Sequence, residues 1–260
     1  MMIVLCLMMF WVNFDKALVL YLPFNEGEGK VAHDMSGCHT DGVIFNAGWA
    51  RGKRGFALEF SGDGYVEVKG GPKRETEEVT LMAWIFSDVM EPRNVIISRC
   101  SKDNVRGYEL SVRKRLGLQF KVFSKGEPDE RIAVVKAENV LRRSRWTHVA
   151  VTFKGKEFIR VYVDGVLKAE GKMDFACSFD DTEPLRIGVG FLKPRTPFFF
   201  KGLIDEVLIF NRALSEEEIR QVIEGMAVLP QGKLPATWGG VKMIGGEGIP
   251  QIKKSKGGGR

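Results

Sequence analysis

Cysteine is scarce in this chain, which argues against several classes of protein. Four cysteines occur in 260 residues, at Cys6, Cys38, Cys100 and Cys177, and no two are close enough for a Cys-x-x-Cys metal or redox motif. Cys6 lies in an N-terminal segment that we expect to be removed, so the other three can form at most one disulfide, whose pairing the sequence leaves open. A buried, unreactive thiol is the simplest interpretation of each.

The net charge is small where a folded domain is expected. The formal net charge is +6, but the last 28 residues hold six Lys and Arg against one Glu, so residues 1–232 are close to neutral. We therefore expect no nucleic-acid partner. Two short basic clusters, Arg113-Lys114-Arg115 and Arg142-Arg143-Ser144-Arg145, are interpreted as solvated turns, with a polyanion site as the alternative.

The N-terminal apolar run is too short to cross a bilayer as a helix. Met1–Val12 comprises 12 uncharged residues, whereas a span needs about 20. Its length is that of a secretion-signal core, although a basic stretch before it and a clear Ala-x-Ala site after it are missing. We expect residues 1–16 to be a signal-like segment of a secreted or extracytoplasmic protein with no stable membrane span. A hydrophobic N-terminal strand, or a start other than Met1, is the alternative.

Alternation of apolar and polar residues is abundant. Trp146–Phe153 and Ile159–Val163 alternate on either side of a Lys-Gly-Lys turn, and Asp164-Gly165 follows where a tight hairpin needs positive φ. Similar segments predict further strands over residues 17–24, 43–45, 57–60, 65–68, 79–86, 95–99, 108–112, 116–123, 132–135, 185–188 and 199–210. Ten or more short strands at roughly ten-residue spacing are typical of an antiparallel two-sheet sandwich or jelly roll.

One helix is predicted near the C-terminal end of this strand-rich region. Ser215 and Glu218 form a capping box, and Ile219, Val222 and Ile223 supply an apolar face that ends near Gly225. Beyond Pro230 the chain is rich in Gly, Lys and Pro, and we expect disorder there. The predicted organisation is a signal-like segment at 1–16, one all-β domain at 17–226 and a basic tail at 227–260.

Four pieces of sequence, taken in order, identify a family resemblance. They are Tyr21-Leu22-Pro23-Phe24-Asn25-Glu26-Gly27 with Asp34-Met35-Ser36-Gly37, then Val79–Ile85, then the hairpin 146–165, then Phe200–Val207 with Asn211-Arg212-Ala213-Leu214-Ser215. Over residues 17–226 the chain resembles the laminin G-like jelly-roll domains of the concanavalin A-like lectin/glucanase superfamily. The resemblance implies two antiparallel sheets, one of them concave, and an extracytoplasmic binding module, but it fixes no ligand.

The resemblance also implies a structural calcium, held between the early polar loop and the late Gly-x-Ile-Asp-Glu segment. Calcium takes six to eight oxygen ligands from carboxylates, carbonyls and water. The matching positions nominate Asp34 and Asp205, with Asp41 as a third ligand. Cys38-His39 stands where relatives often have Asn-Gly. The alternative is structural: Asp34 begins an Asx turn and Asp205 pairs with an arginine.

A carbohydrate site is the next prediction, because sugars stack on aromatic faces beside a few placed polar groups. Trp49, in a predicted loop Gly-Trp-Ala-Arg-Gly, is the preferred exposed aromatic, with a half-buried loop anchor as its alternative. Trp84 and Trp146 fall within strong strands, and we predict that they belong to the core.

Catalytic patterns are lacking. Retaining glucanases of this superfamily need two carboxylates about 5 Å apart, at Glu-x-Asp-x-Glu-like spacing, and no such triplet occurs. In Asp205-Glu206 the adjacent carboxylates are expected to point to opposite faces of a strand. His148 lies on a strand without a Ser or Cys nucleophile pattern nearby and is interpreted as structural. No enzyme activity is predicted.

The sequence thus favours a non-catalytic extracytoplasmic binding module for glycans, assisted by calcium if the metal is bound. Protein–protein adhesion is the alternative, and a glycoside hydrolase is the least favoured reading. Loops and a sheet face on a rigid sandwich would carry the binding.

Overall fold

The computed structural model of the chain describes residues 16–70, 77–88, 93–100, 107–125, 130–177, 183–192 and 196–228. It has eighteen strands and, over Glu216–Val228, the helix α2 within these ranges. The strands are β1 (Leu18–Leu22), β2 (Val31–Ala32), β3 (Gly42–Phe45), β4 (Gly48–Arg51), β5 (Phe56–Ser61), β6 (Tyr65–Val68), β7 (Glu78–Phe86), β8 (Asn94–Cys100), β9 (Gly107–Arg113), β10 (Gly117–Lys125), β11 (Glu130–Ala137), β12 (Thr147–Lys154), β13 (Phe158–Val163), β14 (Val166–Lys172), β15 (Leu185–Ile187), β16 (Val189–Leu192), β17 (Thr196–Phe199) and β18 (Lys201–Phe210).

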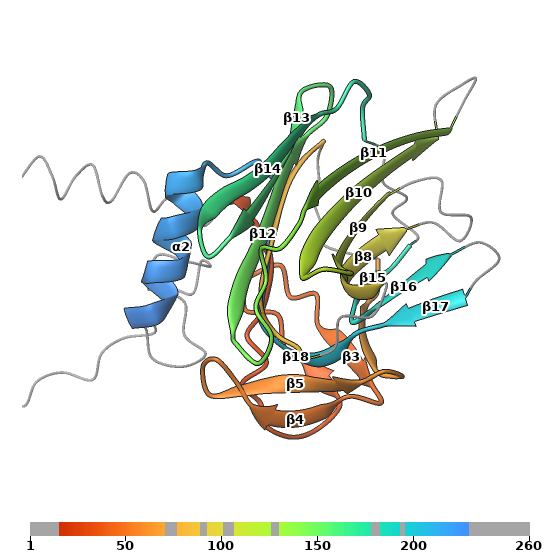
Figure 1. Cartoon of the computed structure of the whole chain (residues 1–260). Coiled ribbons are helices and arrows are strands. Elements are labelled where there is room, and N and C mark those ends of the chain that lie inside the picture. The colour runs from red at the N-terminus through yellow and green to blue at the C-terminus, as the bar shows by residue number, and fades with distance from the viewer. Residues whose placement is uncertain are drawn as a thin grey trace, which may run out of the picture.

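Two antiparallel sheets face each other (Figure 1). Sheet A has the order β14-β13-β12-β7-β18-β5-β4, and β1 pairs with β18 off this path. Sheet B has the order β11-β10-β9-β8-β15-β6-β3-β2, and β16 and β17 form a separate hairpin. The predicted all-β two-sheet jelly-roll sandwich with one helix is confirmed.

The alternation of residues along β7 shows how the sequence builds two cores. Leu81, Ala83 and Ile85 point between the sheets into the main core. Met82 belongs to a second core on the other side of sheet A, and Trp84 packs against that second core. A strand with apolar residues on both faces must be covered on both faces, and α2 supplies the outer cover through Ile219 and Val222.

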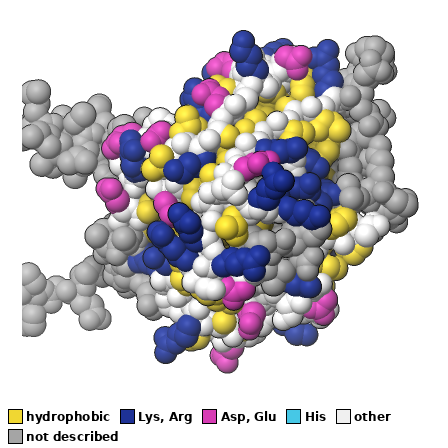
Figure 2. Space-filling view, in the orientation of Figure 1, with side chains coloured by type: hydrophobic (Ala, Val, Ile, Leu, Met, Phe, Trp, Pro, Cys, Tyr) yellow, Lys and Arg dark blue, Asp and Glu magenta, His cyan; other side chains and the backbone are white. Residues whose placement is uncertain are grey.

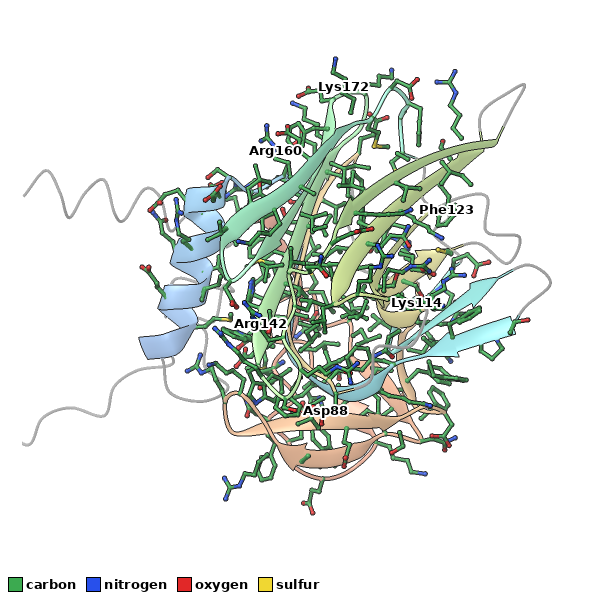
Figure 3. All side chains as sticks on the ribbon, in the orientation of Figure 1. Asp88, Lys114, Phe123, Arg142, Arg160 and Lys172 are labelled. Atoms are coloured by element: carbon green, nitrogen blue, oxygen red, sulfur yellow. The ribbon has the colours of Figure 1, made fainter. Side chains whose placement is uncertain are left out.

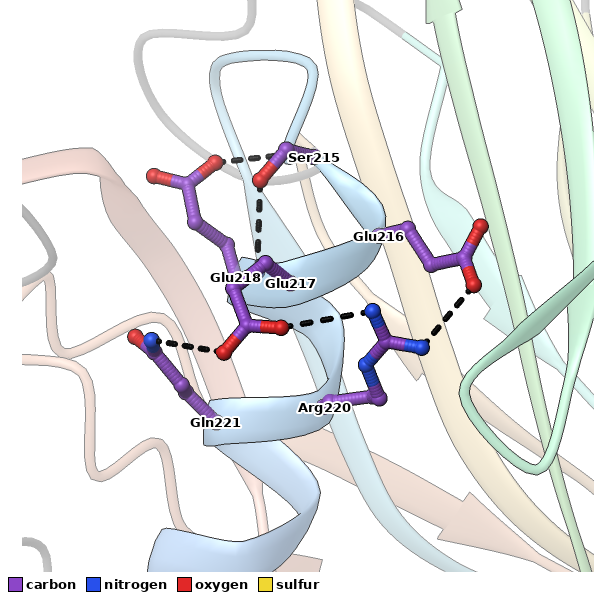
Figure 4. A network of polar contacts seen from close by, with 6 residues as sticks. All are labelled: Ser215, Glu216, Glu217, Glu218, Arg220 and Gln221. Carbon is purple, nitrogen blue, oxygen red and sulfur yellow. Dashed lines mark hydrogen bonds and ion pairs between the residues drawn. The ribbon is translucent and has the colours of Figure 1, made fainter.

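Helix α2 begins as predicted. The Ser215 N–H donates to Oε2 of Glu218 (2.8 Å), and the Glu218 N–H donates to Oγ of Ser215 (3.2 Å). Figure 4 shows this capping box beside the Arg220 guanidinium, which binds Glu216 (3.0 Å) and Glu217 (3.3 Å). The helix continues past the expected end at Gly225 to Val228.

The hairpin β16–β17 packs on the outer face of sheet B. Ser98 Oγ donates to the Val189 carbonyl (2.6 Å), and the Arg93 guanidinium lies over the Phe198 ring at 4.8 Å. Arg93 also binds both carboxylate oxygens of the buried Glu109, with Nε at 2.9 Å from Oε1. A buried ion pair of this kind is tolerated because both charges are hydrogen-bonded in good geometry.

Several details differ from the sequence-based expectation. Trp49 lies on strand β4, not in a loop. Strand β14 was not predicted because it has no buried apolar face: its residues are alternately exposed and half-buried. Cys100 and Cys177 are buried free thiols as expected, and Cys38 is a half-buried one. Burial raises the pKa of Cys177 to about 12.

Residues 1–15 and 229–260, which hold most of the signal-like segment and of the basic tail, lie outside the described residues. Among the helices in the described ranges, none combines the length and apolarity that a bilayer crossing requires.

Candidate functional site

Asp34 is the centre of a hydrogen-bonded loop. Its carboxylate accepts four hydrogen bonds, from the N–H of Tyr21 (3.0 Å), the N–H and Oγ of Ser36 (both 2.9 Å) and the N–H of Thr40 (2.9 Å). The contact with the Ser36 N–H, two residues ahead, is an Asx turn. Asp34 is 4% exposed, so these donors take the place of water around the buried charge.

Asp41 supports this loop from its rim. Its Oδ1 accepts the N–H of Asp34 (2.8 Å), and its Oδ2 lies 3.1 Å from Nδ1 of His33. The side chains of His33 and Asp41 are 61% and 47% exposed. Asp34 and Asp41 are thus brought together by the loop, as the sequence predicted.

Asp205 lies in a different setting, on strand β18. The register of β18 against β7 shifts between Asp205 and Leu208, and Glu206 has a φ of 51°, which marks a β-bulge. Ile204 and Val207 both point into the main core. The extra residue therefore places Asp205 and Glu206 together on the side away from that core, and the prediction that they point to opposite faces is wrong.

The two bulge carboxylates share a small set of partners. The Arg54 N–H donates to Oδ2 of Asp205 (3.1 Å), and Nε of Arg54 lies 3.9 Å from Oε1 of Glu206. The Tyr21 hydroxyl donates to Oε2 of Glu206. Both carboxylates are fully buried, and Oδ1 of Asp205 has no hydrogen-bond partner. Burial first, and then the neighbouring Glu206, raise the pKa of Asp205 to about 8, and burial also raises the pKa of Glu206.

The three positions nominated for calcium lie in two different settings. The oxygens of Asp34 are all occupied by protein donors, which would compete with a metal for the same lone pairs. Asp205 contacts the Arg54 backbone instead of the Asp34 loop. Within the described residues no group of three or more His, Cys, Asp and Glu side chains is arranged to hold a metal. The residues do not fit a calcium shared by Asp34, Asp41 and Asp205. The calcium site stays a prediction, and the Asx turn favours its structural alternative.

A pocket opens on the outer face of sheet A, beside α2. It has a volume of about 380 Å³ and is lined by Lys53, Trp84, Arg145, Trp146, Asp164 and Ile223. We call it the aromatic pocket. Trp84 and Trp146 are each half-buried. Trp84 also packs against the second core, as predicted, whereas Trp146 lies just before β12 and belongs to neither core, so the prediction is wrong for Trp146.

Lys53 covers one of the two indoles. Its ammonium lies 4.4 Å from the centroid of the Trp84 ring, a cation–π distance. Lys53 follows Gly52, where an added Cβ would lie 2.2 Å from the Phe56 carbonyl oxygen and 2.7 Å from Oδ2 of Asp205. Only glycine fits there, so the buried Asp205 and the turn at Gly52 together fix the loop that brings Lys53 to the pocket.

Two other lining residues of the aromatic pocket form an ion pair. Nη2 of Arg145 lies 3.5 Å from Oδ2 of Asp164, and the two side chains are 63% and 42% exposed. Asp164 also accepts the His148 N–H (3.0 Å), which fixes its carboxylate at the predicted Asp-Gly turn. Residues 164 and 165 have φ values of 49° and 75°, as that turn requires.

His148 lies beneath the pocket and is not part of its surface. Its ring meets Trp84 edge-on at 5.3 Å, and it is fully buried with neither ring nitrogen hydrogen-bonded. Burial lowers the pKa of His148 to about 3, so the imidazole is neutral at physiological pH. This arrangement fits the structural role predicted for it.

Trp49 does not contribute to the aromatic pocket. It is half-buried on β4, packs against the main core, and its indole N–H donates to the Gly29 carbonyl (3.1 Å). The pocket residues Lys53, Arg145 and Asp164 were missed because they come from separate loops. One signal could have located the pocket: β7 and β12 are both strongly predicted strands, and their pairing places Trp84 opposite His148.

Comparison with curated proteins finds one short match. The human adhesion G-protein coupled receptor D1 (Homo sapiens) is 31% identical over 74 residues, which cover 28% of this chain and 8% of the receptor. The chain therefore spans only a small part of that relative.

Several solved structures share the fold at low sequence identity. Domain 4 of a GH43 extracellular arabinanase from Geobacillus stearothermophilus, in complex with arabinotriose, has a TM-score of 0.61 and 19% identity over 79% of this chain and 98% of that one. The binding domain of botulinum neurotoxin DC in complex with SialylT has a TM-score of 0.59 and 16% identity over 81% of this chain and 52% of that one. The same toxin domain has also been solved with rat synaptotagmin II, with a TM-score of 0.60 and 16% identity.

A family model matches the part of the chain that runs from the end of β5 to the start of α2 and contains most strands of both sheets. Its match runs over residues 60–220, which is more than half of the sequence. The model represents laminin G-like domains of the concanavalin A-like lectin/glucanases superfamily. Together with the two-sheet architecture, this match shows that the chain belongs to the concanavalin A-like lectin/glucanases superfamily.

Proposed function

We propose that this chain is a non-catalytic, extracytoplasmic binding module that recognises carbohydrate through the aromatic pocket. The carrying observation is the pairing of two half-buried indoles, Trp84 and Trp146, with the charged groups of Lys53, Arg145 and Asp164 in one open pocket. Indole faces stack on sugar rings, and a few fixed polar groups orient the hydroxyls. Neighbouring structures support this assignment, because two of them were solved with arabinotriose and with SialylT.

We propose that the module is not catalytic because its adjacent acidic residues, Asp205 and Glu206, are buried. Asp205 and Glu206 are fully buried beneath the Arg54 loop, so neither carboxylate can reach a glycosidic bond in this arrangement. Glycoside hydrolysis needs two carboxyl groups that flank the substrate. In the aromatic pocket Asp164 is the one carboxylate among the lining residues, and it is paired with Arg145.

A glycan-array screen of the full chain tests the proposal, run with two matched tryptophan variants. Trp146→Ala removes a pocket wall and should weaken binding about tenfold, whereas Trp49→Ala, on β4, should leave binding within about twofold. Circular dichroism and melting curves check that both variants fold. Loss of binding in Trp49→Ala alone would move the site to β4, and a blank array for the wild type would reject the carbohydrate proposal.

Protein adhesion is the second candidate function, and one observation favours it. Val31 and Val43 are cross-strand partners on β2 and β3, and Phe45 stacks on Tyr65 at 4.7 Å. Val31, Val43 and Phe45 are 38–41% exposed, so they form an apolar stripe at one edge of sheet B. Capture of a partner protein that Val43→Lys abolishes, together with a blank glycan array, would favour adhesion.

A further inference from the structure

The two basic clusters noted in the sequence are neighbours in space. The N–H groups of Asn139 and Val140 donate to the carbonyls of Arg115 and Leu116 (both 3.1 Å), and the Leu141 N–H donates to the Leu116 carbonyl (2.9 Å). These bonds fix the β11–β12 connection against the β9–β10 turn. They therefore bring the cluster at 142–145 to the cluster at 113–115.

The β9–β10 turn forms one wall of a second hollow. It has a volume of about 340 Å³, and its lining includes Arg113, Lys114, Arg115 and Lys136, with Glu138 as the single lining carboxylate. Lys114, Arg115 and Lys136 are exposed. These three cations form no ion pair with the carboxylates of the described residues. They are thus available to an anion from outside.

A smaller depression adjoins the aromatic pocket, with which it shares Arg145. Its lining includes Val112, Arg142 and Arg145. Arg145 also lines the aromatic pocket, and Val112 directly precedes Arg113 of the second hollow. We call the resulting row the basic track, which comprises Lys53, Arg145, Arg142, Arg113, Lys114 and Lys136.

Basic side chains gather on one face of the molecule (Figure 2). Figure 2 shows several Lys and Arg side chains gathered in the middle of one face. Figure 3 shows Arg142 and Lys114 at a similar height in that same orientation, with Lys172 far above them. A protein whose residues 1–232 are almost neutral thus concentrates positive charge on one part of its surface.

Lys53 indicates what chemistry the aromatic end accepts. Its ammonium covers the Trp84 face on which a sugar would stack, at 4.4 Å. A neutral sugar that displaces this cation can offer it only hydroxyl acceptors, whereas a sugar with an anionic substituent can also pair with its charge. Lys53 is therefore placed where it would favour acidic sugars over neutral ones.

We infer that the aromatic pocket and the basic track together bind a linear acidic oligosaccharide, with one sugar on the tryptophans and the following anionic groups along the track. This inference rests on the proposed carbohydrate function. A single-stranded nucleic acid fits less well, because its bases need successive aromatic platforms, and the described track residues provide indoles at one end only.

The test uses the full chain and four fluorescent probes in polarisation assays. The probes are a sulfated hexasaccharide, a hexasaccharide that carries carboxylates only, a neutral hexasaccharide and a single-stranded oligonucleotide of matched charge. The track variant is Arg113→Gln/Lys114→Gln/Arg142→Gln. Its matched control, Lys156→Gln/Lys168→Gln/Lys172→Gln, loses the same charge from exposed positions outside the track. Lys53→Met tests the pocket end alone.

The expected result is that an acidic hexasaccharide binds more tightly than the neutral one and loses at least about tenfold in affinity in the track variant at low salt. The control should stay within about twofold, and neutral binding should be unchanged in the track variant. Lys53→Met should weaken acidic binding and strengthen neutral binding. Comparison of the sulfated and carboxylated probes identifies the anionic group.

Three results would overturn the inference. Equal losses in the track variant and the control would reduce the effect to net charge, and equal affinity for the oligonucleotide would make the surface a general polyanion site. Tight neutral binding with no preference for acidic probes would remove the track but keep the carbohydrate function. Failure of all three hexasaccharides with the wild type would instead reject the proposed function itself.

Discussion

Asp34 and Asp205 are two buried aspartates that the protein supports in opposite ways. Asp34 receives four hydrogen bonds from its own loop and from Tyr21. Asp205 is fully buried beside a second carboxylate, and one of its oxygens has no hydrogen-bond partner. A buried charge is stable when donors surround it, and otherwise the group tends to take up a proton. Identical residues thus act as an anchored anion in the Asp34 loop and as a proton-holding group on strand β18.

The largest expected effect comes from removing the anchored anion. Asp34→Ala would leave the N–H groups of Tyr21, Ser36 and Thr40 without their acceptor. Buried donors without partners cost about 1–3 kcal/mol each, so we expect the free energy of unfolding to fall by about 3–5 kcal/mol. Urea unfolding would measure this. Asp34→Asn, which keeps one oxygen acceptor, should fall between alanine and the wild type. A loss below about 1 kcal/mol for alanine would show that water replaces the carboxylate.

The second prediction concerns pH and Asp205. Its pKa is raised to about 8 in the folded protein, against about 3.9 when unfolded. The folded state therefore holds the extra proton between these values, and the stabilising contribution of Asp205 is lost as pH rises through about 8. Asp205→Asn removes this titration. Its free energy of unfolding, relative to the wild type, should rise between pH 5 and pH 8 by up to about 1.4 kcal/mol per pH unit.

Denaturant midpoints of both proteins at several pH values would measure that difference, with Asp63→Asn as a control at another aspartate. Taking the difference between the two proteins cancels the titrating groups that do not interact with Asp205, so the change reports the titration of the Asp205–Glu206 pair. A constant difference across this range would mean that Asp205 is ionised in its bulge.

A smaller loss of stability is expected when one of the four hydrogen-bond donors to Asp34 is removed. Ser36→Ala removes the hydroxyl that donates to Oδ2 of Asp34 (2.9 Å) and accepts the Cys38 N–H (3.2 Å). Three backbone donors remain, so the cost should be about 1 kcal/mol by urea unfolding. A cost equal to that of Asp34→Ala would mean that the hydroxyl, and not the backbone, holds the loop.

The smallest expected effect is that of calcium. Because the oxygens of Asp34 are occupied and Asp205 contacts a different loop, we expect the melting temperature to be the same in calcium and in chelator. A calcium-dependent rise of several degrees, absent from Asp34→Asn/Asp205→Asn, would instead establish the metal site that the family resemblance implies.

The sequence predicted the fold well because the decisive signals are local. The Asp164-Gly165 turn, the Ser215 capping box and the alternation along β7 each depend on residues within a few positions of one another. Strand β4 was read as a loop because glycines flank Trp49, and such flanks are typical of turns.

The candidate site was less predictable because it depends on contacts between distant segments. Trp84 is placed by its pairing with His148 on β12 and with Asp205 on β18. Because of the bulge at Glu206, one of the two carboxylates lies on the face of β18 opposite to the one predicted. The residue types at this position do not predict a positive φ. Registers and bulges of this kind are properties of the assembled sheet, not of its separate strands.

The position of Trp84 gives the pocket an optical readout of its own. The indole lies between the Lys53 ammonium on its face and the neutral His148 ring at its edge. Indole emission responds to nearby charge, so a ligand that displaces Lys53 should change the intensity and wavelength of Trp84 fluorescence without any attached dye. The residue that the strand pattern assigned to the interior thereby becomes the natural reporter of occupancy, and titrations can follow it directly.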